Sequence, residues 1–251
     1  MNAPSMHDAV VLLNAARQSG SLLEALPAHC RPATIADAHA IQDLTVAALG
    51  EAVAGWKIAA APDGTLMRGV VLASRVLASP ARMPAALVPL LGVEAEIAFR
   101  FERDLPPRDR DYSADEVASA VVALPVIEVV DSRFRSYKDT PLLHRLADCM
   151  SNGALVLGAP QRGWRAHDLA TLHVRLEIGG ATIVSRVGGH PTVDPLLPAI
   201  AMANHQRTRE GVRAGQVMTT GSFTGLNYAR PGQSAIATFE GFGAAQVSFE
   251  D

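Results

Sequence analysis

The stretch Gly92-Val93-Glu94-Ala95-Glu96-Ile97-Ala98-Phe99 decides how the chain folds, together with Pro125-Val126-Ile127-Glu128-Val129-Val130-Asp131-Ser132 downstream. Both segments are rich in Val, Ile and Phe and are flanked by turn residues, which predicts two β-strands. Successive side chains of a strand point to opposite faces, so Glu94 and Glu96 share a face. Glu128 lies inside an apolar run, where burying an unpaired carboxylate costs on the order of several kcal/mol. Glu128 therefore needs a compensating partner.

Two interpretations fit these carboxylates. Three carboxylates from two strands can share one divalent cation, and oxygen-only ligands suit Mg²⁺ or Mn²⁺. Alternation of Glu with apolar residues is also typical of a half-solvated strand, on which Glu94 and Glu96 simply face water. Glu128 fits the second interpretation less well, because its neighbours on both sides are apolar. Spacing alone leaves both interpretations open.

The composition limits the class of protein. The chain has 251 residues, 49% of them hydrophobic and 19% charged, which is typical of a globular protein with a substantial core. A net charge of −3 without a basic run argues against binding nucleic acid. The chain has only two cysteines and neither a long apolar run nor a signal-peptide pattern. We expect a cytoplasmic protein that does not bind membranes.

The N-terminal part of the sequence predicts two helices and a strand. Residues 6–17 carry apolar side chains at helical spacing. A second helix begins at Thr34, with Asp37 in a capping box, and ends at Gly50. Its expected apolar face is formed by Ile35, Ala38, Ile41, Leu44 and Ala48. The segment 55–60 reads as a strand, followed by a loop with Pro62, Asp63 and Gly64.

The rest of the chain mixes strands and helices without regular alternation. Helices are expected over 113–122, 141–150 and 191–209, and strands over 154–157, 172–178, 181–187, 234–240 and 244–250. Gly179-Gly180 between two of these strands indicates a hairpin. Short strands with interspersed helices favour an α+β roll over a doubly wound parallel sheet.

Several motifs in register resemble one known family, the 2-keto-4-pentenoate hydratase / 4-oxalocrotonate decarboxylase family of the fumarylacetoacetase superfamily. The resemblance begins near residue 34 and runs to the C-terminus. The motifs are Ile35-Ala36-Asp37-Ala38-His39-Ala40-Ile41-Gln42, Gly55-Trp56-Lys57-Ile58, Val93-Glu94-Ala95-Glu96-Ile97-Ala98-Phe99, Glu128-Val129-Val130-Asp131-Ser132-Arg133, Ala147-Asp148 with Ser151-Asn152-Gly153-Ala154, Gly189-His190-Pro191 and Thr220-Gly221-Ser222. The resemblance implies a fumarylacetoacetase-like mixed β-roll over residues 61–251, preceded over residues 1–60 by an N-terminal helical cap and first strand.

The resemblance also assigns roles to the carboxylates. It implies that Glu94, Glu96 and Glu128 bind Mg²⁺ or Mn²⁺, which in this family chelates the 2-oxo and carboxylate oxygens of a small 2-oxo acid. Lys57 matches the family's strand lysine, implicated in proton transfer or in holding substrate oxygens. A lysine partly desolvated near a metal is expected to have a lowered pKa, which suits acid–base catalysis.

Other site residues are assigned less specifically. Ser151 and Asn152 match the family's substrate-contacting region, although a turn Ser-Asn-Gly serves equally well as a cap. His190 and Ser222 are candidate substrate contacts, with a structural role as the alternative for His190. For Asp131 and Arg133, opposite strand parity to Glu128 predicts an ion-pair network or a subunit contact, away from the metal.

The sequence departs from the family near Gly69. Many members carry an acidic residue before the corresponding glycine, whereas Leu66-Met67-Arg68 precede it here. A guanidinium there suggests a group that binds a second carboxylate of the substrate, so Arg68 is a further substrate-binding candidate.

The function implied is hydration of a 2-hydroxy-2,4-dienoate to a 4-hydroxy-2-oxo acid in aromatic degradation. The closest alternative is decarboxylation of a 4-oxalocrotonate-type acid. An acylpyruvate hydrolase needs a His–Glu pair on a lid, and residues 59–69 contain neither residue. A metal-binding oligomer without catalysis is a further alternative. Family members form homo-oligomers, and we expect the same here.

Overall fold

A computed structural model describes residues 1–60 and 63–251 of the chain. Asp63 and Gly64 of the expected loop lie within these residues, and Pro62 lies outside them. The larger sheet is built from strands β1 (Val53–Ala60), β2 (Leu66–Leu72), β3 (Val76–Ala78), β5 (Gly92–Phe101), β6 (Val121–Val130), β7 (Asn152–Leu157), β10 (Val217–Ser222) and β11 (Asn227–Tyr228). The smaller sheet is built from β4 (Ala81–Pro84), β8 (His173–Ile178), β9 (Ala181–Val187), β12 (Ser234–Phe239) and β13 (Gly243–Glu250).

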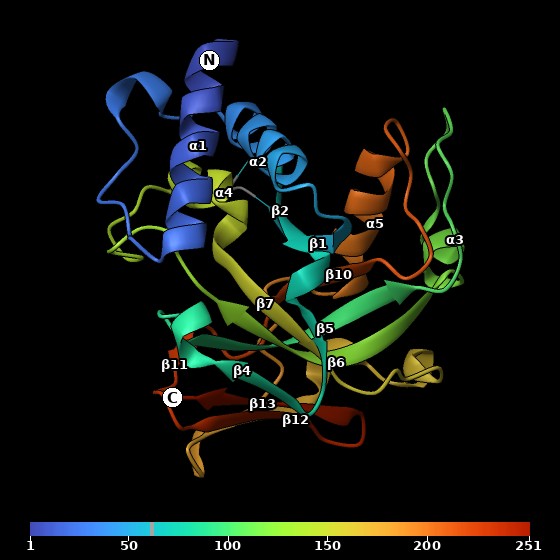
Figure 1. The fold of residues 1–251 in the computed structure, drawn as a ribbon. Coiled ribbons are helices and arrows are strands. Elements are labelled where there is room, and N and C mark those ends of the chain that lie inside the picture. Colours follow the sequence, from blue (N-terminus) through green and yellow to red (C-terminus); the bar gives the residue numbers. More distant parts are fainter. Residues whose placement is uncertain (61–62) are drawn as a thin grey trace.

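The larger sheet is strongly curled (Figure 1). Its strand order is β2-β1-β10-β5-β6-β7-β3, with β11 paired to the end of β5. The strands near the two ends of this order, β2 and β7, lie close to each other, so one face of the sheet becomes an interior. Parallel pairs (β1–β10, β3–β7) occur beside antiparallel pairs, which makes the sheet mixed.

The two sheets pack against each other across the main apolar core. The smaller sheet has the order β4-β13-β12-β8-β9, and β12 and β13 lie over β6. All ten residues of β6 are buried, which explains why its sequence is apolar on both faces. The molecule is therefore the expected α+β roll.

Three helices cover one end of the roll, as Figure 1 shows at the upper left. Helix α1 (Ala3–Ser19) packs on α2 (Ile35–Leu49), and α2 packs on α4 (Leu142–Ala147). The predicted capping box of Thr34 and Asp37 is present, and Gly50 ends α2 in the left-handed conformation. The N-terminal helical cap is thus confirmed.

The orientation of α2 differs from the expected one. Leu44 and Ala48 are exposed, whereas Ala38, Ile41, Gln42 and Thr45 are buried. Gln42 faces inward because it satisfies backbone groups of edge strand β2: its amide donates to the Arg68 carbonyl at 2.8 Å and accepts from the Val70 N–H at 3.0 Å. Edge strands expose such groups, and here a helix covers them.

Three other helices are shorter than the sequence predicts. Helix α3 (Ala114–Ala118) ends before Val122, which belongs to β6. Helix α4 stops at Ala147, because the chain then enters a left-handed turn. Helix α5 (Leu196–Gln206) begins five residues after Pro191, since the segment from His190 bends back toward β10.

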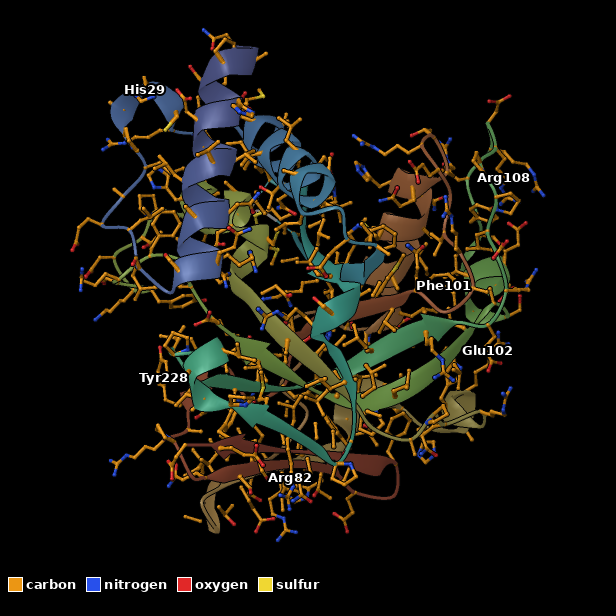
Figure 2. All side chains as sticks on the ribbon, viewed as in Figure 1. His29, Arg82, Phe101, Glu102, Arg108 and Tyr228 are labelled. Carbon is orange, nitrogen blue, oxygen red and sulfur yellow. The ribbon has the colours of Figure 1, made fainter. Side chains whose placement is uncertain are left out.

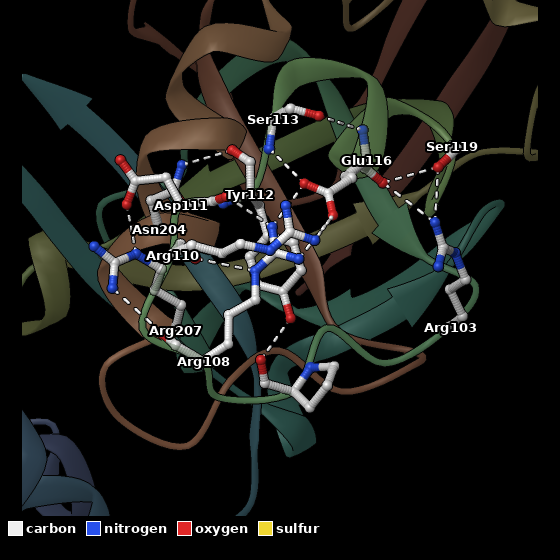
Figure 3. Close-up of polar contacts among 11 residues, drawn as sticks. Arg103, Arg108, Arg110, Asp111, Tyr112, Ser113, Glu116, Ser119, Asn204 and Arg207 are labelled. Atoms are coloured by element: carbon white, nitrogen blue, oxygen red, sulfur yellow. Dashed lines mark hydrogen bonds and ion pairs between the residues drawn. The ribbon is translucent and has the colours of Figure 1, made fainter.

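Charged residues fix the loop between β5 and α3 against α5 (Figure 3). Arg108 lies over the Tyr112 ring, 3.4 Å from its centroid, and forms two hydrogen bonds with Glu116. Arg207, which directly follows α5, pairs with Asp111 of the loop. The loop thereby holds α5, which packs on β1 and β10. Over the described residues, no helix has the length and apolarity required to span a membrane.

Candidate metal centre

Glu94, Glu96 and Glu128 meet on the interior face of the curled sheet. Strands β5 and β6 are antiparallel neighbours, and their register places Glu94 directly opposite Glu128. Glu96 lies two residues along β5 and so shares that face. One carboxylate oxygen from each glutamate lies within 4.8 Å of the other two. Beyond them the interior is filled by apolar side chains, namely Val71, Ala98, Val122, Leu124, Val126, Leu155 and Val217.

The three carboxylates are mostly removed from water. Glu96 and Glu128 are 3% and 2% exposed, while Glu94 is partly exposed and marks the open side of the cluster. Burial, reinforced by the charge of Glu128, raises the pKa of Glu94 to about 7. The same two causes raise the pKa of Glu96 well above its ordinary value. Crowded carboxylates of this kind are stable as anions only with added positive charge.

Lys57 provides part of that charge. It lies on β1, is 6% exposed, and forms an ion pair with Glu128. Burial alone would lower the pKa of Lys57, but the contact with Glu128 and the charges of Glu94 and Glu96 outweigh burial and raise it. The carboxylates thus stabilise the ammonium, and the lowered pKa expected for a lysine beside a bound metal stays a prediction.

The Lys57 ammonium has a second fixed partner. It donates a 2.7 Å hydrogen bond to the Met150 carbonyl, which belongs to the turn between α4 and β7. Cys149, Met150 and Ser151 all have positive φ, between 51° and 56°, so this turn is left-handed over three residues without a glycine. Such residues cost on the order of 1–3 kcal/mol each, and surrounding contacts must hold them.

Gly69 makes room for this turn. It lies on β2 directly opposite Lys57, and a Cβ built there would lie 2.5 Å from both the Cys149 carbonyl oxygen and the Met150 Cβ. Any side chain at Gly69 would therefore push the turn away from Lys57.

A buried ion network holds the turn from the other side. Asp148, 1% exposed, accepts hydrogen bonds from Arg133 Nε at 2.6 Å and from Arg17 of α1 at 3.3 Å. Arg133 also pairs with Asp131 at 3.1 Å and donates to the Asn152 carbonyl. The prediction of an ion-pair network for Asp131 and Arg133 is thus confirmed, and it lies directly behind the turn.

Four predicted substrate contacts are buried or partly buried. Ser151 and Asn152 are each 1% exposed, and within the described part of the chain the Ser151 hydroxyl and the Asn152 amide nitrogen have no hydrogen-bond partner. Ser222 lies beside Glu94 and offsets part of the rise in its pKa. His190 is 3.4 Å from the Thr220 hydroxyl. Their role as substrate ligands stays a prediction.

Arg68, predicted to bind substrate, does not lie with the carboxylate cluster, and this corrects its predicted position. It is opposite Ile58 in the β1–β2 pair, so its side chain leaves the sheet on the face away from Lys57. Its guanidinium instead binds Asp43 of α2, at 2.7 and 2.8 Å from the two carboxylate oxygens. The register of the β1–β2 hairpin, which the sequence does not reveal, decides this placement.

The sequence analysis missed three backbone features of the site. They are the Met150 carbonyl, the Gly221 N–H, which is 3.4 Å from Glu96 Oε2, and the close approach at Gly69. Only Gly69 carries a signal, because a glycine inside a strand often marks a close backbone approach.

The donor set fits a divalent cation. All three converging ligands are carboxylates, which suits a hard ion such as Mg²⁺ or Mn²⁺. Three carboxylate charges face one ammonium, and a divalent cation would neutralise the remainder.

Comparison with known proteins identifies the family. No family model matches the chain. The 2-keto-4-pentenoate hydratase of Paraburkholderia phymatum is 30% identical over 252 residues, covering 95% of each chain. The chain belongs to the 2-keto-4-pentenoate hydratase / 4-oxalocrotonate decarboxylase family.

Solved structures agree with this membership at the level of the fold. The 4-oxalocrotonate decarboxylase from Pseudomonas putida G7, complexed with magnesium and adipate, has a TM-score of 0.82 at 20% identity and covers 99% of this chain and 98% of its own. The fumarylacetoacetate hydrolase of Exiguobacterium antarcticum has a TM-score of 0.54 at 16% identity, covering 80% of this chain and 76% of its own. The chain thus has the same fumarylacetoacetase-like roll as these structures.

Proposed function

We propose that this protein is a divalent-metal-dependent hydratase of 2-hydroxy-2,4-dienoates, acting in aromatic degradation. Overall, the enol tautomer ketonises and water adds to the remaining C=C bond, which gives a 4-hydroxy-2-oxo acid. The single observation that carries the proposal is the convergence of Glu94, Glu96 and Glu128 beside Lys57 in a buried interior. The hydratase relative in the same family supports it.

Glu94, Glu96 and Glu128 would hold the cation, which we propose to be Mg²⁺ or Mn²⁺. When bound, the cation would act as a Lewis acid that stabilises negative charge on the oxygens of a 2-oxo acid. The magnesium in the P. putida decarboxylase structure supports the choice of metal.

Lys57 is the proposed proton donor. An ammonium beside the three carboxylates can donate a proton to substrate carbon or a hydrogen bond to substrate oxygen. The Met150 carbonyl and Glu128 fix the direction of the ammonium. Ser151 and Asn152 bring unpartnered polar groups to the adjacent turn, and we propose that they bind substrate oxygens together with His190 and Ser222.

The placement of cations supports hydration over decarboxylation. A 4-oxalocrotonate-type substrate carries a second carboxylate, for which an arginine or lysine would be the natural partner. Among the described residues around the cluster, Lys57 is paired with Glu128, and Arg133 is paired with Asp131 and Asp148. Arg68 lies on the other face of the sheet. Decarboxylation is the second candidate, because both reactions use the same 2-oxo acid chemistry.

We propose that the chain acts as a homo-oligomer, as expected from the family. Large apolar side chains are exposed along β9 and near α5, at Ile183, Val187, Val193 and Leu197. Light scattering should return a multiple of the 26.4 kDa chain mass. A mass equal to that of one chain would refute the proposed oligomer but would leave the proposed metal site unaffected.

The test of function is turnover followed by ultraviolet absorbance. Freshly generated 2-hydroxypenta-2,4-dienoate and 2-oxohex-3-enedioate are each given to metal-free protein and to protein with Mg²⁺ or Mn²⁺. Metal-dependent loss of the dienoate chromophore without CO₂ release is the expected result. CO₂ release from the dicarboxylate would move the assignment to decarboxylase, and Mn²⁺ binding without turnover of either acid would indicate an inactive metal-binding protein.

A further inference from the structure

A cavity lies on the face of β1 and β2 that points away from the carboxylates. It has a volume of about 720 Å³ and is lined by α2, the two strands and the segment that connects α5 to β10. This volume is typical of pockets that bind small molecules. Val46, Trp56 and Val70 provide apolar wall, and Arg68 lies in the wall with its side chain only 2% exposed.

Positively charged side chains outnumber negatively charged ones in the lining of this cavity. Arg68 and Arg209 both approach the same carboxylate, Asp43, at 2.7 Å and 3.9 Å. At the rim, Arg213 is paired with its own acid, Glu210, at 3.5 Å. Two guanidinium groups therefore share one carboxylate, and an anion placed in the cavity would complete the pairing.

Arg68 has donors to spare for such an anion. Only its Nη2 atom contacts Asp43, and within the described part of the chain its buried Nε has no hydrogen-bond partner. Leaving a charged donor buried and unpaired is costly, and a carboxylate in the cavity would give the guanidinium a further negative partner. Arg68 is the residue that the sequence marked for carboxylate binding, and its surroundings suit that chemistry here.

We propose that this cavity is a second binding site, for a small organic carboxylate with an apolar body. The carboxylate binds Arg68 and Arg209, and the apolar body packs against Val46, Val70 and Trp56. The site is separate from the carboxylate cluster, because Arg68 and Lys57 leave the β1–β2 pair on opposite faces. It does not depend on the proposed hydratase activity.

Trp56 makes the proposal directly measurable. The chain has two tryptophans, and the variant Trp164→Phe leaves Trp56 as the only one. Full-length Mg²⁺-loaded protein of this background is titrated with hexanoate and, separately, with uncharged hexanamide while Trp56 fluorescence is recorded. We expect a saturable change with hexanoate only, and at least a tenfold weaker apparent affinity in Arg209→Ala.

Arg82→Ala is the matched control. Arg82 is an exposed arginine with one acidic partner, Glu250, and it lies on the smaller sheet at the bottom of Figure 2, away from α2. This variant should bind hexanoate as the background protein does. The proposal would be overturned if hexanoate produced no fluorescence change, or if hexanamide produced the same change as hexanoate. It would also be overturned if Arg82→Ala weakened hexanoate binding as much as Arg209→Ala does. A response lost in Glu96→Gln but kept in Arg209→Ala would place the ligand at the carboxylate cluster and also overturn it.

Discussion

The Lys57 ammonium lies between the Glu128 carboxylate and the Met150 carbonyl, almost out of water. We expect Lys57→Met to lower kcat by about 10²- to 10⁴-fold, because a positioned proton donor contributes about that much. Lys138, the other lysine of the chain, is exposed and gives the control Lys138→Met. Steady-state rates of both variants at saturating metal test this. A loss below tenfold in Lys57→Met would show that Lys57 is not the proton donor.

His39 makes stability sensitive to acid. Its Nε2 accepts a 3.1 Å hydrogen bond from the Arg68 N–H, and burial, with the nearby charge of Arg68, lowers its pKa to about 3. An unfolded histidine titrates near its ordinary value of 6.5, so the unfolded chain binds more protons between these values. The stabilisation that neutral, buried His39 gives the folded protein is therefore complete above about pH 6.5 and is lost as the pH falls toward about 3.

Replacing His39 should therefore flatten the acid dependence. Glutamine can accept the same hydrogen bond without titrating, so His39→Gln should lose less stability than the wild type between pH 7 and pH 4.5 in urea unfolding. Exposed His29 (Figure 2) pairs with Asp8 and gives the control His29→Gln. Parallel losses in wild type and His39→Gln would refute the role of His39.

The left-handed turn Cys149–Ser151 connects the cap to the site. Gly69→Ala should displace it, since the new Cβ would clash with the Cys149 carbonyl, and the Met150 carbonyl would leave Lys57. We expect kcat to fall at least tenfold while the affinity for Mn²⁺ stays within about twofold, because the carboxylates lie on β5 and β6. Gly163→Ala, where nothing lies within 4 Å of the new Cβ, is the control. Unchanged kcat in Gly69→Ala would contradict this role of the turn.

The elements that were predicted well from the sequence are those whose apolar residues follow a clear pattern. The alternation in β5 correctly placed Glu94 and Glu96 on one face, and the apolar run around Glu128 correctly predicted the strand β6. The turn Cys149–Ser151 left no such signal, because its left-handed residues are not glycines. The placement of Arg68 failed for a related reason: its face depends on the β1–β2 register, which tertiary contacts set.

At the scale of the molecule, buried ion pairs between side chains join the helical cap to the roll. Arg17 of α1 and Arg133, which follows β6, meet at the buried Asp148. Arg133→Met should destabilise the protein by about 3–5 kcal/mol, because it leaves two buried carboxylates without their main partner. Arg17→Met should cost less, about 1–2 kcal/mol, since Asp148 keeps Arg133. Urea unfolding of both variants tests the order, and a larger loss in Arg17→Met would contradict it.

The sequence indicated the architecture of the whole molecule more clearly than its interior. Helical and strand patterns, with the family resemblance, led to the α+β roll and its cap. The curl of the larger sheet, which turns one face into the interior holding Glu94, Glu96 and Glu128, arises from contacts between distant strands such as β2 and β7. Such contacts follow from packing of the assembled chain and leave no local pattern.

The most direct test of the central claim is Mn²⁺ binding measured by electron paramagnetic resonance. Wild-type protein should bind one Mn²⁺ per chain at the carboxylate cluster, and Glu96→Gln should weaken binding by about 100-fold or more, since it removes one ligand of three. Glu102 (Figure 2) pairs with exposed Arg162, and the control Glu102→Gln should bind Mn²⁺ as the wild type does. Equal Mn²⁺ binding by wild type and Glu96→Gln, or none by wild type, would contradict the account.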